Sequence, residues 1–421
     1  MTSLRRWLIP SLIATLGLAG CASDEPPGER IASEKTRVTK PDVPAEDLAA
    51  LVSGNTDFAA SLYRRISKPG DNLLFSPFSI SQAFAMVYTG ARGDTESQMA
   101  QALHFTLPQE RLHPAVNALN LALHSRADAP VKGRGSPPTL RLVNAAWGQK
   151  GLTFEPSFLD VLAQDYGTGM YAVDFTTKSK SIRDDINTWV EKQTMGRIED
   201  LLPVDAVTPA TRLLLANALY FKGAWQQPFN EAGTYEAPFH TLGGDTRQVP
   251  MMSASVSVPF LDSEDFTAFA LPYVGKAFRM LVIVPEAGRF EQVESRLSAD
   301  FLEGVRAGLS DSSIALEFPR FEMKQAFSLD EALKALGMVD AFTERADLSG
   351  MIQQADFRLS VAQHQAFIAV KEQGTEAAAA TVVGVGPTSA PPPFIVDRPF
   401  LFLIEDVETK SVLFLGRFVN P

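Results

Sequence analysis

The side chains that could carry catalysis or bind a metal are few in this chain and follow no known reactive pattern. Its 421 residues include five histidines and one cysteine. The histidines lack the H-E-x-x-H spacing that places two imidazoles and a general base around zinc. The G-x-S-x-G turn of hydrolases and the G-x-x-x-x-G-K-[ST] phosphate loop are also missing from the sequence. The histidines are His104, His113, His124, His240 and His364.

The acidic residues give no better case for an active site. They are numerous but scattered, and their spacing does not distinguish a paired acid and base from solvated surface groups. We therefore predict that the chain is not an enzyme and has no catalytic residue, no metal site and no cofactor. The sequence leaves open an active site assembled from distant residues, which would make the protein a surface enzyme.

Two polar residues lie inside apolar runs. Asn217 is part of "LLLANALYF" and His364 is part of "SVAQHQAFIAV". A buried polar group without a hydrogen-bond partner costs about 1–3 kcal/mol, so we interpret both as core residues that find partners. Polar contacts of this kind between strands can hold a sheet closed or let it open.

Residues 371–394, "KEQGTEAAAATVVGVGPTSAPPPF", have an unusual composition for a segment near the end of a large domain. Alanine is the best helix former and a poor strand former, so Thr375–Thr381 has the local pattern of a capped helical turn. Gly384, Gly386 and three consecutive prolines follow before a helix of useful length can form. Local propensity alone does not explain why the chain contains this segment.

The N-terminus has the pattern of an export signal. Arg5 and Arg6 precede an apolar run that ends in "LAGC" at Leu18–Cys21, and the run is shorter than the roughly 20 residues that span a bilayer. The ending resembles a bacterial lipoprotein signal, which predicts a signal peptide over residues 1–20 and a lipid on Cys21. Ala22 follows the cysteine, which favours the outer membrane or the cell surface. The alternative is a plain signal peptide with an incidental cysteine.

Composition limits what the mature chain can be. Its net charge of −11 and pI near 5.1 argue against a nucleic-acid partner, because proteins that bind the phosphate backbone carry basic patches. Cys21 is the only cysteine, so no disulfide can form within the chain and packing must hold the fold. Residues 21–46 are polar and contain proline, which predicts a flexible tether. From residue 47 to 421 the pattern is that of one globular domain.

The periodicity within the domain mixes helices and strands without a strict βαβ rhythm, which predicts an α+β fold. Helical patterns cover Leu48–Ile66, Ser79–Tyr88, Ile182–Gln193 and Leu329–Leu336. Strand patterns cover Leu140–Ala146, Leu213–Phe221, Met280–Val284, Ile314–Phe318, Ala366–Val370, Phe400–Ile404 and Val412–Phe418.

An ordered set of motifs through residues 47–421 resembles the serpin family. The motifs are "NLLFSPFSI" (72–80), "GARGDTESQM" (90–99), "NTWVEKQTMGRIEDLLP" (187–203), "LLLANALYFKGAWQQPF" (213–229), "FPRFEMKQAFSLDEALKALGMVDAF" (318–342), "ADLSGM" (346–351) and "DRPFLFLIEDVETKSVLFLGRFVNP" (397–421). Each motif alone is weak, but their order is specific. The resemblance implies a single domain of three β-sheets and about nine helices, with an exposed reactive-centre loop over about residues 372–396.

The resemblance also gives the unusual segment a role. Serpins present this loop to a protease, and after cleavage its N-terminal part inserts as a new strand of the main sheet with the acylated protease attached. Small residues suit a strand that must slide between two others, and Gly374 provides a pivot. Alternation places Thr375, Ala377 and Ala379 on the buried face. The hinge residues implied in this way are Glu372, Gly374, Thr375, Glu376, Ala377, Ala378, Ala379 and Ala380.

The cleaved bond follows from the family spacing between the hinge glutamate and that bond, which implies cleavage between Thr388 and Ser389 or within one to three residues of it. A small, uncharged residue before the bond does not fit a trypsin-like pocket and fits elastase-like or subtilisin-like proteases. We therefore expect a monomeric suicide inhibitor whose partner is an extracellular serine protease, held as a covalent acyl complex. The alternative is a non-inhibitory serpin that acts as a protease substrate or carrier, although the hinge lacks the charged or bulky residues typical of such members.

Other family positions imply where opening of the main sheet is controlled. Ser76, Ser79, Asn217 and His364 match a polar cluster beneath the centre of the main sheet. Trp225, Arg320 and Glu372 match the place where the loop first enters the sheet. From these last positions we predict an ion pair between Arg320 and Glu372.

Overall fold

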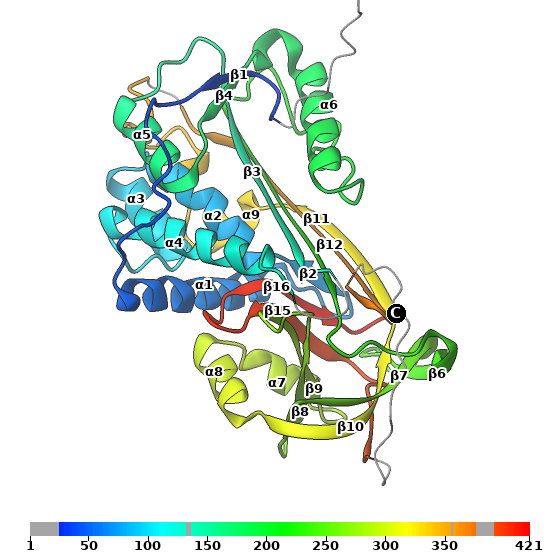
Figure 1. Cartoon of the computed structure of the whole chain (residues 1–421). Helices are drawn as coiled ribbons and strands as arrows, with labels where there is room; N and C mark the ends of the chain where they lie inside the picture. The colour runs from blue at the N-terminus through cyan, green and yellow to red at the C-terminus, as the bar shows by residue number, and fades with distance from the viewer. Residues whose placement is uncertain (1–24, 132–135, 355–356, 376–390) are drawn as a thin grey trace, which may run out of the picture.

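Two β-sheets form the frame of the protein (Figure 1), in a computed structural model that describes residues 25–131, 136–354, 357–375 and 391–421. The main sheet has seven strands in the order β1-β4-β3-β5-β13-β12-β11. Its strands are β1 (Glu29–Ile31), β3 (Thr139–Gln149), β4 (Met170–Val173), β5 (Leu213–Ala224), β11 (Phe321–Ser328), β12 (Leu359–Lys371) and β13 (Gly374–Thr375).

The second sheet has nine strands and joins the two smaller sheets that the family resemblance implied. Its strand β7 (Thr246–Asp262) is long enough to pair with β6 along its first part and with β8 at residues 260–262. The hydrogen-bonded path therefore runs through both smaller sheets without a break. Its other strands are β2 (Leu73–Phe75), β6 (Tyr235–His240), β8 (Phe266–Pro272), β9 (Phe278–Pro285), β10 (Ser310–Pro319), β14 (Pro393–Ile395), β15 (Phe400–Asp406) and β16 (Val412–Phe418).

Nine α-helices within the described residues surround these sheets. In Figure 1, α1 to α4 lie on one side of the main sheet and α6 lies on the other, so helices cover both faces. The helices are α1 (Ala45–Ile66), α2 (Pro77–Tyr88), α3 (Gly93–Ala102), α4 (Gln109–Ala127), α5 (Pro156–Val161), α6 (Phe175–Gln193), α7 (Phe290–Ser295), α8 (Ala299–Gly308) and α9 (Asp330–Ala335). No helix of the described chain is both long enough and apolar enough to cross a bilayer.

Helix α2 lies in the core and contacts strands of both sheets, including β5 and β16. All twelve of its residues are buried, which agrees with a sequence that is mostly apolar and has no charged residue. Ser76 caps its N-terminus by accepting a hydrogen bond from the backbone N–H of Ser79 at 3.2 Å, and Pro77 occupies the first turn, where its missing N–H has no cost. This helix therefore fixes the position of Ser76 and Ser79 beneath the main sheet.

The prediction of a flexible tether over residues 21–46 is wrong for much of the part that the structure describes. Residues 29–31 form β1, which pairs with β4 at the edge of the main sheet. The buried indole N–H of Trp147 donates to the carbonyl of Pro27 at 2.8 Å, and the amide of Asn117 donates to the carbonyl of Val38 at 2.7 Å. These contacts use the backbone of the segment, so its polar side chains gave no sign of them.

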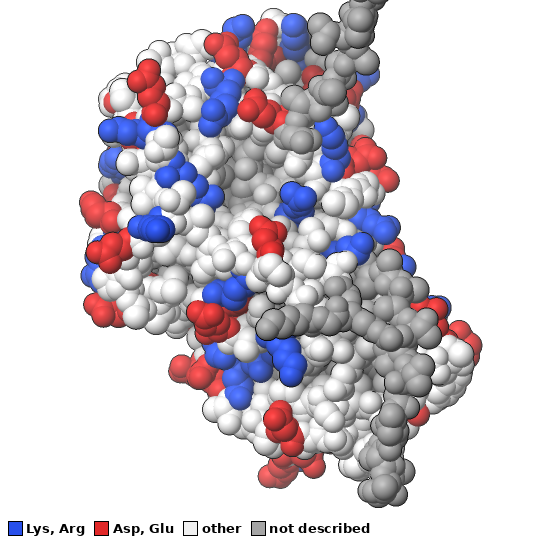
Figure 2. Space-filling model, in the orientation of Figure 1, with Lys and Arg blue, Asp and Glu red and all other residues white. Residues whose placement is uncertain are grey.

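The face of the molecule shown in Figure 2 has no large patch of one charge. Basic and acidic side chains are interspersed over most of this face. A functional site must therefore be sought in specific contacts, and the centre of the main sheet has the most informative ones.

Candidate functional site at the hinge and centre of the main sheet

Strand β13 is only two residues long and lies between the two central strands of the main sheet. Gly374 and Thr375 pair antiparallel with Lys371 and Val370 of β12 on one side, and with residues 224 and 223 of β5 on the other. Further along, β5 and β12 are parallel and pair directly with each other from Leu213–Leu359 to Leu219–Ala366. Gly374 and Thr375, near the start of the loop segment, thus already lie between β5 and β12, which pair directly with each other further along.

The two hinge residues fit this narrow position because of their size. Gly374 has φ = +144°, and a Cβ there would lie 2.2 Å from the carbonyl oxygen of Gly223. Thr375 is fully buried, and its hydroxyl lies 2.7 Å from the hydroxyl of Tyr273. Position 374 therefore requires glycine, and position 375 requires a small side chain.

Trp225 organises the backbone that leads into β13. Its indole N–H donates to the carbonyl of Lys371 at 2.9 Å, and its backbone N–H donates to the carbonyl of Gln373 at 2.9 Å. Its ring stacks on Tyr273 with centroids 4.6 Å apart and planes 15° apart. Trp225 thus contacts both the turn after β12 and Tyr273, the aromatic residue that contacts Thr375.

The predicted ion pair between Arg320 and Glu372 is present in the structure. The guanidinium of Arg320 donates to Oε1 of Glu372 at 3.3 Å, and the hydroxyl of Thr234 donates to the same oxygen at 2.7 Å. The Glu372 side chain is 7% exposed and the Arg320 side chain is 46% exposed. The carboxylate is therefore fixed by the protein, while its charged partner reaches it from the surface.

A row of polar side chains crosses the centre of the main sheet. His364 of β12 lies opposite Asn217 of β5, which lies opposite Asn144 of β3. The amide of Asn217 donates to the hydroxyl of Ser79 at 2.5 Å and also to the side-chain oxygen of Asn144. Ser76 joins the row from helix α2, because its backbone N–H donates to Nε2 of His364 at 3.0 Å. The structure therefore brings together the four residues that the sequence suggested.

The hydrogen bonds of His364 define its protonation state. Nε2 accepts from Ser76, so Nδ1 carries the proton and donates to the oxygen of Asn217 at 2.5 Å. Complete burial lowers the pKa of His364 to about 3, which keeps the ring neutral at physiological pH. A neutral ring satisfies both contacts, whereas a charged ring would lose the acceptor that Ser76 requires.

Sequence reasoning missed Asn144, which completes the row. It lies in "RLVNAAW", inside a predicted strand, so an amide in an apolar run was a signal of the same kind as that of Asn217. Its amide donates to the carbonyl of Ser79 at 3.3 Å. The row therefore fastens β3, β5 and β12 to the start of helix α2.

Several predicted site residues lie outside the described residues: Cys21, the hinge residues Glu376, Ala377, Ala378, Ala379 and Ala380, and the proposed cleavage site Thr388–Ser389. Within the part of the chain that the structure covers, no group of three or more His, Cys, Asp or Glu residues could hold a metal ion.

The arrangement as a whole can accept a strand. A segment that continued from β13 would run antiparallel to both β5 and β12, and it would replace their parallel pairing with two antiparallel ladders. Antiparallel pairs are slightly more stable per residue than parallel ones, and strand addition is an established mode of protein recognition. The described residues therefore show where an added strand would lie, between β5 and β12 and in line with β13.

Comparison with known proteins agrees with this description. The family described as serpin (serine protease inhibitor) matches residues 53–421. An uncharacterized serpin-like protein of Thermococcus kodakarensis is 36% identical over 376 residues, which cover 88% of this chain and 86% of that protein. A leukocyte elastase inhibitor of Sus scrofa is 37% identical over 385 residues, which cover 88% of this chain and 99% of the inhibitor.

A solved structure is similar as well. Human thyroxine-binding globulin in complex with its hormone superposes with a TM-score of 0.79 at 32% identity, covering 89% of this chain and 99% of that one. The chain belongs to the serpin family, whose members are protease inhibitors rather than enzymes.

Proposed function

We propose that this protein is a suicide inhibitor of an extracellular serine protease that prefers small residues. The protease would cut between Thr388 and Ser389 and become acylated by Thr388, and the loop would then insert between β5 and β12. The observation that supports this proposal most directly is β13, because its residues already lie between the two strands that insertion must separate. The name of the relative from Sus scrofa, an elastase inhibitor, supports the protease class.

The closed part of the sheet is suited to such a change. The direct pairing of β5 with β12 reaches Leu219–Ala366 on the side of β13. The polar row with His364 and Asn217 lies two residues inside this paired stretch. Separating β5 from β12 breaks the contact between these two side chains. The energy needed to break it holds the sheet closed until cleavage frees the loop.

The test is to mix the protein with an elastase and, separately, with a subtilisin, and to run a denaturing gel. We expect a band, resistant to boiling, at the summed mass of the two proteins less the released residues 389–421, together with a protein cut in the loop. Mass spectrometry of the released C-terminal fragment should give Ser389 as its first residue. Cleavage in the loop without a covalent band would contradict inhibition and support the alternative of a substrate or carrier. Resistance to both proteases would contradict the protease class.

We also propose that the chain is exported and anchored by a lipid on Cys21. The support is the sequence pattern of residues 1–21 alone. In a bacterial host, labelled palmitate should be incorporated into the wild-type chain but not into the variant Cys21→Ser. Equal labelling of both, or release of the wild-type protein into the medium without label, would contradict the anchor.

A further inference from the structure

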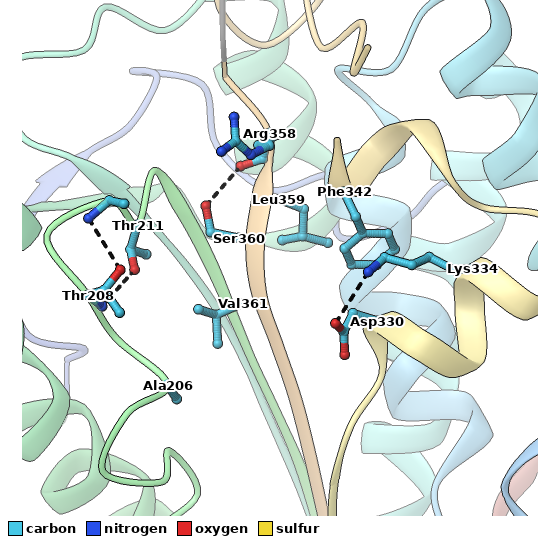
Figure 3. Close-up of a pocket in the computed structure, with 11 residues that line it drawn as sticks. Ala206, Thr208, Thr211, Asp330, Lys334, Phe342, Arg358, Leu359, Ser360 and Val361 are labelled. Carbon is cyan, nitrogen blue, oxygen red and sulfur yellow. Dashed lines mark hydrogen bonds and ion pairs between the residues drawn. The ribbon is translucent and has the colours of Figure 1, made fainter. Parts of the chain in front are cut away.

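A cavity lies at the opposite end of the two central strands from the hinge. Its volume is about 310 Å³, and it is formed by the loop that precedes β5 and by the first residues of β12, with α9 and η3 (Asp340–Phe342) on the other side of β12 (Figure 3). The residues that line it are Ala206, Thr208, Ala210, Thr211, Asp330, Lys334, Phe342, Arg358, Leu359, Ser360 and Val361.

The register of β13 connects this cavity to the loop. Thr375 pairs with Val370 and with Gly223, and each later residue of an antiparallel strand pairs with an earlier residue of its two neighbours. Continued for thirteen residues, this register places Thr388 opposite Ala210 on the side of β5. On the side of β12 it places Thr388 within two residues of Arg358, allowing for the irregularity between Leu359 and Val361.

The charges at the cavity favour an anion. Lys334 is balanced by Glu331 at 2.9 Å and Asp330 at 3.6 Å. Arg358 is partly buried, its backbone carbonyl accepts from the hydroxyl of Ser360, and its guanidinium makes no hydrogen bond or ion pair with another described residue. The guanidinium of Arg212, which follows the lining residues on the other side, donates to the carbonyls of Pro209 and Thr211 and to no carboxylate among the described residues. Two guanidinium groups thus flank the cavity without a described carboxylate partner.

A hydrogen bond between the two sides of the cavity would be replaced by loop insertion. The backbone N–H of Arg212 donates to the hydroxyl of Ser360 at 3.1 Å, which joins the residues just before β5 to the start of β12. Figure 3 shows Ser360 directed from β12 toward the segment that carries Thr208 and Thr211. A strand that arrived between β5 and β12 would come between these two groups.

Cleavage supplies the charge that the cavity lacks. In the proposed reaction Thr388 is first joined to the protease serine as an ester, with the amino group of Ser389 as the leaving group. Where water then hydrolyses this ester, the carbonyl carbon of Thr388 gains an oxygen and becomes a carboxylate, and the protease serine leaves as its hydroxyl. We infer that this cavity binds the new carboxylate of Thr388 at the end of the inserted loop, with Arg358 as its principal partner. The inference rests on the proposed insertion of the loop.

The test uses two synthetic peptides with the sequence of residues 376–388, one ending in a free carboxylate and one in an amide, each with the same N-terminal fluorophore. Each peptide is incubated with the full uncleaved protein, and bound peptide is measured on native gels together with the melting temperature. We expect both peptides to bind, and the acid to bind about ten-fold more tightly, as a charge-assisted hydrogen bond predicts.

The variants assign the effect to the cavity. Arg358→Gln should remove the preference for the acid, and Arg358→Lys should keep part of it. Arg247→Gln is the matched control, since Arg247 is an exposed residue of β7 and should leave the preference unchanged. The melting temperature of each variant without peptide shows that it has folded.

The outcomes separate this inference from the proposed function. Equal binding of acid and amide, or an acid preference that persists in Arg358→Gln, overturns the carboxylate site while insertion still stands. Failure of both peptides to bind overturns insertion and the site together. An acid preference that is present in the wild type and in Arg247→Gln but absent in Arg358→Gln supports both the carboxylate site and the insertion of the loop.

Discussion

At the scale of single residues, Glu372 is the carboxylate whose partners hold the hinge in place. Its side chain is almost fully buried and accepts hydrogen bonds from Thr234 and Arg320, which come from distant parts of the chain. The family resemblance was sufficient to predict the ion pair with Arg320, because both residues match positions where the loop first enters the main sheet. It was not sufficient to predict Thr234, whose position depends on how the segment before β6 folds over the hinge.

We expect the variant Glu372→Lys to be destabilised by about 1–3 kcal/mol, because it leaves the Thr234 hydroxyl without its acceptor and places two positive charges together. The loosened hinge should also admit strands from other molecules, so mild heating should produce oligomers on size-exclusion chromatography. The control is Glu264→Lys, since that carboxylate is 90% exposed. A Glu372→Lys protein that stays monomeric and melts with the wild type would contradict this role.

A second expectation at this scale concerns pH. His364 has a pKa of about 3 in the folded protein because it is buried, against about 6.5 in an unfolded chain. The unfolded state therefore binds more protons between these values, and stability falls as the pH falls below 6.5. At pH 5 the cost from this residue is about 2 kcal/mol.

Denaturant unfolding at pH 7 and pH 5 measures this dependence. The variant His364→Gln should lose less stability over that range than the wild type, even though it is less stable at pH 7. His113 keeps part of the dependence in both proteins, because burial and then the charge of Arg92 lower its pKa to about 3 as well. Equal losses in variant and wild type would show that His364 does not titrate as its burial implies.

At the scale of elements, the structure confirms each helix and strand that periodicity predicted, with longer bounds in most cases. The pattern of apolar residues was enough to predict α2 and β5, because these elements lie in the core and most of their side chains must be apolar. Strands β1 and β13 were not predictable in this way. Each has two or three residues and is held by backbone hydrogen bonds to neighbours that the chain reaches only after folding. The same reason explains why the described part of the expected tether is structured.

Strand β1 offers a prediction at this scale. Gly28 has φ = +112°, and a Cβ there would lie 2.6 Å from a methyl group of Val173 and 2.9 Å from the carbonyl oxygen of Ala172. Gly28→Ala should therefore push β1 away from β4 and destabilise the fold. Gly244→Ala is a matched control, because Gly244 also has a positive φ, +89°, but no atom within 4 Å of its added Cβ.

Both glycine variants carry the backbone strain of alanine at positive φ, about 1 kcal/mol. We expect Gly28→Ala to lose about 1–2 kcal/mol more than the control in denaturant unfolding, as the hydrogen bonds around β1 weaken. Similar losses in the two variants would mean that β1 contributes nothing to stability beyond the strain at its glycine.

At the scale of the whole molecule, the proposed insertion implies that the native fold is not the most stable arrangement that the cleaved chain would allow. Strands β5 and β12 pair in parallel where an antiparallel strand would fit between them, and the loop segment that would fill this place is joined to β14 at its far end. Cleavage removes that connection. If the loop inserts as proposed, the native state has a higher free energy than the cleaved, inserted form, and the difference comes from the order of the strands and not from any single residue.

The last prediction measures this difference in free energy. About ten new ladder hydrogen bonds at ~1 kcal/mol each would make the cleaved, inserted form more stable by on the order of 10 kcal/mol. Cleavage in the loop should therefore raise the melting temperature by on the order of 10 °C or more, as measured by calorimetry on intact and cleaved protein.

The variant Thr375→Arg tests whether insertion causes the rise. Thr375 is fully buried against Tyr273, and an arginine cannot be placed there without burying its charge between strands. The variant should be cleaved as readily as the wild type yet show little gain in melting temperature. Thr375→Val, which keeps the size, should retain most of the gain. If cleaved wild-type protein melts with the intact form, the loop does not insert and inhibition by this mechanism is ruled out.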